Sequence, residues 1–164
     1  MNSDLLLLFA SMQQVADLRT LRPAVAWLLF AAFAAHNVEE ALTMPAFLRD
    51  AAQGPLGAFG VGEHLLPPFL VAVTAVTIFG LAITATHAIA PRLAWPHDAL
   101  RILAWVMLVN VAVPHAPAAV MSGGYAPGLA TALAVTLPVT VAYLVSTSRR
   151  RVGKNRTGVP HVAI

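Results

Sequence analysis

Residues 21–44 read LRPAVAWLLFAAFAAHNVEEALTM, and this stretch decides the fold. It is an apolar run at least as long as the ~20 residues that a helix needs to cross ~30 Å of hydrocarbon. It also contains His36, Glu39 and Glu40, which share one face of a helix that turns about 100° per residue. Because a charged residue in the centre of a bilayer helix costs about 2.5–3.5 kcal/mol, this face must point into a bundle.

The rest of the chain has the composition of a membrane protein. Hydrophobic residues make up 59% of it and charged residues only 10%, whereas a typical soluble domain has about 25% charged residues. Three further apolar segments reach spanning length, at residues 65–90, 99–121 and 127–146. We therefore predict an all-α integral membrane bundle of about four transmembrane helices, with a short N-terminal interfacial helix.

The positions of Lys and Arg predict the domain limits and the topology. We expect an N-terminal cytoplasmic or interfacial segment at residues 1–20, the transmembrane domain at residues 21–148, and a basic, disordered cytoplasmic tail at residues 149–164. With both termini in the cytoplasm, every Lys and Arg except Arg49 obeys the positive-inside rule. This distribution accounts for the net charge of +3 without a nucleic-acid partner.

A second polar group is expected at the depth of the first. Helix geometry places His36 about 21 Å beyond Arg22, in the outer half of the membrane, and His115 in the third segment reaches a similar depth. Pro114 has no N–H, so the carbonyl of Asn110 loses its helical partner. Since Asn110 and His115 lie about 140° apart on an ideal helix, they face one cavity only if this helix is distorted.

Three short motifs make the chain resemble a known family. HNVEE at residues 36–40, a downstream histidine and YAPG at residues 125–128 follow the order and spacing of the HXXEE-domain family of small, mainly bacterial membrane proteins. The resemblance extends from about Trp27 to Thr140. It supplies no reaction, but it implies the bacterial cytoplasmic (inner) membrane as the location. It also implies these characteristic positions: His36, Glu39, Glu40, His115, Tyr125, Pro127 and Gly128.

Histidines and carboxylates inside a bundle favour a membrane enzyme that acts on an apolar or amphipathic small molecule. Our first hypothesis is general acid–base catalysis of an isomerase, cyclase or epoxide-opening type. The expected catalytic residues are His36, Glu39, Glu40 and His115. We expect Asn110 and Tyr125 to bind the substrate, and membrane lipids to be the other partners.

Three alternatives use the same residues differently. In a metal-dependent membrane hydrolase, His36, Glu40 (or Glu39) and His115 would bind a divalent ion such as zinc and leave one position open for water. HxxEE lacks the paired histidines of HExxH enzymes, so the sequence ranks this alternative slightly lower. A non-enzymatic protein would bind lipid or a small molecule, or would couple transport to protons as a homo-oligomer. In the last alternative, the cluster only fixes the packing of helices.

Overall fold

The computed structural model describes the backbone of residues 3–156, and the side chains of residues 23–147 apart from those of Pro114 and Ser122. These described residues contain no strand. Four of their helical stretches are long and apolar enough to span a membrane: Pro23–Gln53, Glu63–Ile89, Trp95–Met121 and Leu129–Thr147. The predicted all-α membrane bundle is confirmed, and the four spans agree with the predicted segments to within several residues at most ends.

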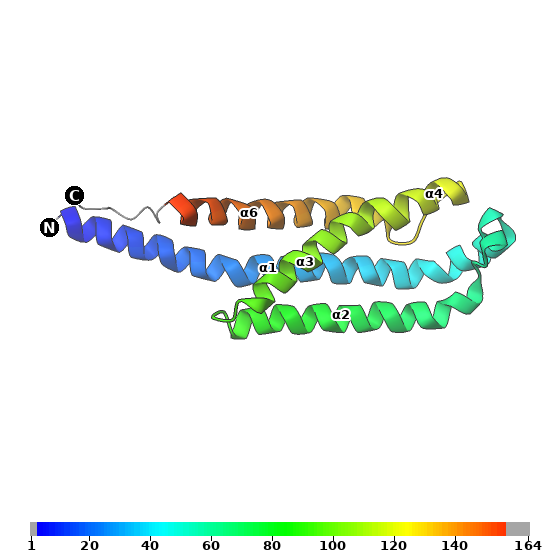
Figure 1. Cartoon of the computed structure of the whole chain (residues 1–164), viewed down its shortest axis with the longest axis horizontal. Helices are drawn as coiled ribbons and strands as arrows, with labels where there is room; N and C mark the ends of the chain where they lie inside the picture. The colour runs from blue at the N-terminus through cyan, green and yellow to red at the C-terminus, as the bar shows by residue number, and fades with distance from the viewer. Residues whose placement is uncertain (1–2, 157–164) are drawn as a thin grey trace.

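The described residues form ten helical elements. In chain order they are α1 (Ser3–Gln53), the 3-10 helices η1 (Pro55–Phe59) and η2 (Glu63–Leu65), α2 (Leu66–Ile89), α3 (Trp95–Asn110), the π-helix η3 (Val111–His115), α4 (Ala116–Ser122), α5 (Leu129–Thr131), the π-helix η4 (Ala132–Thr136) and α6 (Leu137–Arg156). α1, α2 and α6 lie along one axis (Figure 1). α2 runs antiparallel beside α1, whereas α3 leaves the end of α2 and crosses α1 obliquely toward α6 (Figure 1).

The structure adds detail to the prediction at both ends of the chain. The expected interfacial helix is continuous with the first span, because α1 runs unbroken through the boundary expected at residue 20. Helices often end at a glycine, and the first glycine of the chain is Gly54. α1 accordingly continues past Pro45 and ends at Gln53. At the other end α6 continues to Arg156, so the first half of the tail is helical rather than disordered. The expected tail beyond it, at residues 157–164, lies outside the described residues.

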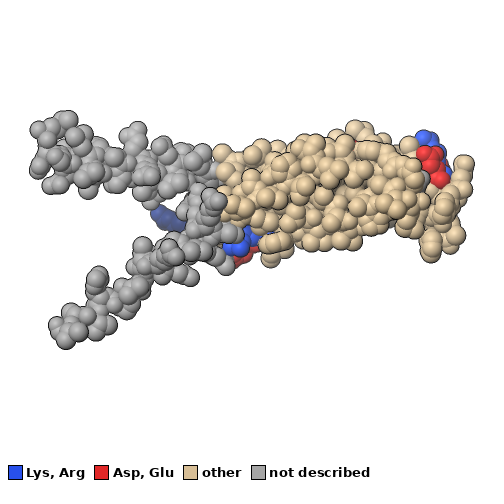
Figure 2. Space-filling model, turned by 90° about the horizontal axis from the view of Figure 1, so that it is seen from above, with Lys and Arg blue, Asp and Glu red and all other residues tan. Residues whose placement is uncertain are grey.

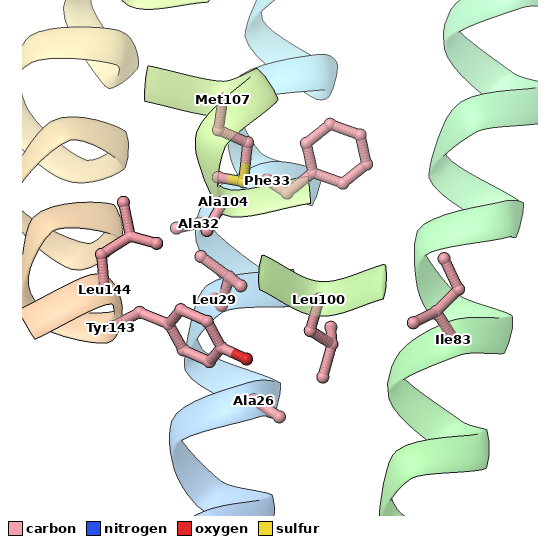
Figure 3. Packing of buried hydrophobic residues seen from close by; sticks show 10 residues of the cluster. All are labelled: Ala26, Leu29, Ala32, Phe33, Ile83, Leu100, Ala104, Met107, Tyr143 and Leu144. Atoms are coloured by element: carbon pink, nitrogen blue, oxygen red, sulfur yellow. The ribbon is translucent and has the colours of Figure 1, made fainter. Parts of the chain in front are cut away.

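The bundle has two halves that we name by their connections. The turn half contains the link between α2 and α3 at residues 90–94, and the loop half contains η1, η2 and the loop at residues 123–128. The turn half holds the apolar core (Figure 3). Its alanines let the helices approach closely, which favours packing between helices in lipid. The buried residues of this core are Ala26, Leu29, Ala32, Phe33, Ile83, Leu100, Ala104, Met107, Tyr143 and Leu144.

The outer surface of the described bundle is apolar along most of its length. On the face shown in Figure 2, Lys, Arg, Asp and Glu appear only toward the two ends of the described body. Large hydrophobic side chains are exposed between these ends, and Val71, Ile78 and Phe79 on α2 are each more than half exposed. Such a surface requires lipid as its solvent. The fold is therefore that of a multi-pass membrane protein.

Candidate functional site

Two histidines and a glutamate meet in the loop half of the bundle. His36 and Glu40 lie one turn apart on α1, and His115 ends the π-helix η3. The Nε2 atoms of the two histidines are 3.2 Å apart, and each lies 3.5 Å from Oε1 of Glu40. Both histidines are 3% exposed. The predicted convergence of these three residues is therefore present in the structure.

The π-helix brings Asn110 to the same point. In an α-helix, residues five apart face different directions, but a π-helix places residue i+5 almost above residue i. Pro114 lies within this π-helix, and its missing N–H removes one bond of the α-helical ladder. As a result, Asn110 Nδ2 lies 3.3 Å from His115 Nε2 and 3.2 Å from His36 Nε2. The helix distortion that the sequence required for a shared cavity is thus observed.

Hydrogen bonds on the far side of each ring decide which nitrogen carries the proton. Thr131 Oγ1 lies 3.1 Å from His36 Nδ1, and its hydroxyl donates to the carbonyl of Gly128. The threonine oxygen is then available to accept, so we assign the proton of His36 to Nδ1, which leaves a lone pair on Nε2. The His115 ring bonds the backbone carbonyl of Pro127, which can only accept. Since His115 Nε2 faces the cluster, Nδ1 donates to this carbonyl.

Three hydrogen-bond acceptors therefore point at one another in a buried place. They are the two Nε2 lone pairs and the Glu40 carboxylate. The Asn110 amide can donate to the imidazole nitrogens, and a cation or an added proton would relieve the remaining repulsion. Their separations of 3.2 and 3.5 Å fit a metal site, because ligands about 2.0–2.1 Å from a tetrahedral zinc ion lie about 3.3 Å apart. These three residues form a group that could hold a metal ion.

Asn110 lies next to two of these three candidate ligand atoms. Its amide nitrogen is 3.2 and 3.3 Å from the two imidazole nitrogens. A half-turn of the amide group would present its oxygen to the centre instead, because the two ends of an asparagine amide have almost the same shape. A fourth ligand could thus be the asparagine oxygen, or a water or substrate oxygen that the amide N–H groups bind.

A glycine lets the loop at residues 123–128 close over the cluster. Gly128 has a φ of 78°, a left-handed conformation that favours glycine. A Cβ atom added there would lie 2.6 Å from His36 Cε1, 2.7 Å from Glu40 Cγ and 3.0 Å from His115 Cε1. The backbone of the YAPG motif therefore packs directly on all three candidate ligands, and no larger residue fits.

The two neighbouring glutamates have different surroundings. Glu39, expected as a catalytic residue, accepts the backbone N–H of Ala130 at 3.2 Å and that of Thr131 at 2.7 Å. A carboxylate at these free N–H groups stabilises the start of the helical stretch that follows Gly128. Glu39 therefore fixes the element that carries Thr131, whereas Glu40 faces the histidines.

A cavity of about 780 Å³ opens from the cluster. His36, Glu40, Asn110 and His115 line it, and most of the remaining wall is aliphatic or aromatic. Tyr125, expected as a substrate-binding residue, does not line this cavity. The residue is 48% exposed and lines a separate hollow, together with Leu42 and Met121.

Sequence reasoning missed Thr131 and the partly buried hydrogen bond that Asn37 Nδ2 donates to Thr77 Oγ1 over 2.7 Å. Thr131 follows the YAPG motif by three residues, about one helical turn. This spacing of one turn puts Thr131 on the same side of the helix as Gly128, and it is the one sequence signal that could have identified Thr131. The pairing of Asn37 with Thr77 depends on the register between α1 and α2, which the sequence does not encode locally.

Comparison with known proteins agrees with the three motifs. A family model described as "Protein of unknown function with HXXEE motif" matches residues 27–143, which include every residue of the cluster. Neither the curated proteins nor the solved structures contain a match to the chain. Because the match covers most of the sequence, the chain belongs to the HXXEE family.

Proposed function

We propose that the chain is a membrane-embedded, metal-dependent hydrolase of an amphipathic or apolar substrate, with His36, Glu40 and His115 as the metal ligands. One observation carries the proposal: the Nε2 atoms of two histidines and a carboxylate oxygen converge at ligand spacing on a cavity. Two histidines, a carboxylate and one further position form a recognised catalytic set. Our first hypothesis from the sequence was acid–base catalysis without a metal. It accounts for these three neighbouring acceptors only if the cluster also binds added protons.

The residues around the ligands have the chemistry that hydrolysis requires. A divalent ion held by His36, Glu40 and His115 would supply a nucleophilic water at neutral pH and would polarise a carbonyl oxygen. In ester hydrolysis the water oxygen bonds to the carbonyl carbon, the bond from that carbon to the alkoxy oxygen breaks, and the leaving alkoxide takes up the proton that the water loses. Glu40 has a second carboxylate oxygen that can carry this proton. The Asn110 amide can donate to the negative oxygen that develops on the carbonyl.

Metal analysis tests the proposal directly. Protein purified in detergent without added metal should retain about one divalent ion per chain. His115→Ala should lose it, and His64→Ala, at an exposed histidine of η2, should keep it. A wild-type chain that binds no divalent ion, even after dialysis against zinc, would refute the hydrolase and restore acid–base catalysis as the leading hypothesis.

Proton-coupled transport is a second candidate, favoured by one observation. The hydroxyls of Thr136 and Thr140 are buried on one face of η4 and α6, without a hydrogen-bond partner among the described residues. These two hydroxyls lie between the cluster and the turn half of the bundle. They could bind waters that conduct protons. In liposomes with a pH gradient, the wild type should then dissipate the gradient, and Thr140→Val should slow it. A wild type without proton flux excludes this candidate.

For location we propose the bacterial cytoplasmic (inner) membrane, with both termini in the cytoplasm. The bias of Lys and Arg supports this orientation. The chain has no cysteine, so single probes at Ala52 and Gly153 report the two sides without background labelling. A membrane-impermeant thiol reagent added to whole cells should label Ala52→Cys and spare Gly153→Cys. The reverse pattern would overturn the topology.

A further inference from the structure

The cavity is long, and its polar groups lie in the middle of it. Toward the end of the loop half, its wall includes Phe47, about 16 Å along α1 from His36, and Phe69 on α2. Toward the turn half it reaches Ala99, about 16 Å along α3 from Asn110. The bond between Asn37 and Thr77 fixes α1 and α2 side by side at the level of the cluster. Two apolar arms therefore extend from the candidate metal site in opposite directions along the helices.

The cavity also opens sideways. Phe79 on α2 and Ile102 and Val106 on α3 line it, yet they are 66%, 64% and 57% exposed. Phe33 and Met107, which line it too, are 8% and 3% exposed and form its floor. Figure 1 shows α2 and α3 joined at the turn half and diverging from there. The exposed rim lies near the middle of both spans, at the depth of lipid tails rather than at water.

From this shape we infer the substrate class of the proposed hydrolase: a long-chain molecule whose reactive carbonyl lies inside the chain, with an apolar segment on each side. The molecule enters from the bilayer between α2 and α3. Its carbonyl stops at the cluster, and one apolar segment lies in each arm. A single-chain lipid with its polar group at one end fits less well, because one arm then stays empty. The inference depends on the proposed function for its chemistry but on the cavity alone for its geometry.

The arms act by shape rather than by hydrophobic attraction. Lipid tails are as apolar as the cavity wall, so a substrate chain gains little free energy merely by leaving the bilayer. An arm left empty forfeits van der Waals contacts along its wall, and a segment that is too long clashes with its end. The position of the carbonyl along the chain should therefore decide binding more strongly than total chain length does.

Saturated long-chain ketones of equal length test this inference without turnover. In such a series the carbonyl moves stepwise from the chain end, as in a methyl ketone, to the centre. Each ketone is equilibrated with the protein in lipid nanodiscs, and the retained ketone is quantified by mass spectrometry. We expect internal ketones to bind about tenfold or more tightly than the methyl ketone. Equal binding across the series would overturn the inference.

Three variants at exposed alanine or isoleucine positions locate the arms. Ala72→Trp should narrow the arm in the loop half and Ile102→Trp the arm and opening toward the turn half. Ala82→Trp is the matched control, because Ala82 is exposed on α2 and does not line the cavity. The first two should each move the preferred carbonyl toward a chain end, and the control should not. A preference that none of the variants moves would place the ketones elsewhere and overturn the inference.

Metal content is measured in the same preparations, which separates the two proposals. Wild-type protein that holds the metal but binds all ketones equally contradicts only the substrate class. Wild-type protein that prefers internal ketones but binds no divalent ion contradicts the metal-dependent hydrolase and leaves the shape of the cavity as the explanation for the preference.

Discussion

The turn half and the loop half of this bundle use the same helices but are held together in different ways. In the turn half, Leu29, Leu100 and Ala104 are completely buried in an apolar core (Figure 3). In the loop half, hydrogen bonds join helices far apart in sequence, such as those between His36 and Thr131 and between Asn37 and Thr77. The turn half has an apolar core that also walls one arm of the cavity, and the loop half holds the polar groups that line the middle of the cavity.

The difference teaches where stability and function lie in this fold. Lipid is as apolar as a leucine side chain, so the turn half gains from close packing rather than from the hydrophobic effect. The loop half gives up close packing and depends on hydrogen bonds that also orient the imidazoles. We therefore expect substitutions in the turn half to change stability and leave the metal bound. In the loop half, substitutions of the ligands or of Gly128 should remove the metal at a smaller cost in stability.

The largest effect is expected at Gly128. Gly128→Ala places a methyl group within 3.0 Å of His36, Glu40 and His115, so the loop must move away and the three ligands must separate. Metal analysis should find essentially no bound ion. Gly123→Ala is the control, because Gly123 also has a positive φ, of 63°, but a Cβ there meets nothing within 4 Å. This control should lose only about 1 kcal/mol of stability, because alanine is strained in the left-handed conformation, and it should keep the metal. Equal metal content in the two variants would contradict the observed packing.

One substitution in each half tests most directly whether metal binding and packing stability are separate properties of the two halves. His115→Ala removes one of three ligands and should abolish stoichiometric metal binding. Leu100→Ala should keep the metal and lower the stability of the bundle by about 2 kcal/mol, the low end for such a cavity, because only packing is lost in lipid. Metal analysis and thermal unfolding in detergent measure both. If Leu100→Ala also lost the metal while still folded, the two halves would not be separable.

The neighbouring glutamates sharpen the comparison within the loop half. Glu40→Gln removes the charged ligand and should lose most of the metal. Glu39→Gln keeps an oxygen that can accept one backbone N–H, so it should keep the metal and cost about 0.5 kcal/mol of stability. Zinc titration of the two apo-proteins reports both affinities. A larger loss of affinity in Glu39→Gln than in Glu40→Gln would exchange their roles.

The sequence predicted the four spans because hydropathy and length are local properties. It also predicted that His36, Glu40 and His115 would meet, since helix depth and the cost of a charge in lipid leave few other arrangements. The distortion at Asn110 was foreseeable from Pro114, because the missing N–H is a property of that residue. Most of the fold and the centre of the site could therefore be predicted from properties of individual residues and short segments.

Other features depend on how the helices sit against one another, which no local pattern encodes. Glu39 and Glu40 were expected to act together, and only the position of residues 128–131 over α1 separates their contacts. Tyr125 was expected at the site because its motif is near, but its ring lies by another hollow. Thr131 was missed because membrane threonines usually bond their own backbone, as Thr84 and Thr86 do here.

Thr131 provides the smallest predicted effect and the finest test. Thr131→Val keeps the shape of the side chain and the backbone N–H that Glu39 accepts, but it removes the oxygen that His36 Nδ1 contacts. Loss of such a partner of a metal-binding histidine usually lowers metal affinity about 10- to 100-fold. Thr86→Val is the control, because Thr86 is bonded only to the carbonyl of its own helix. Zinc affinity unchanged in both variants would mean that His36 is oriented by packing alone and that the threonine contact adds nothing to the site.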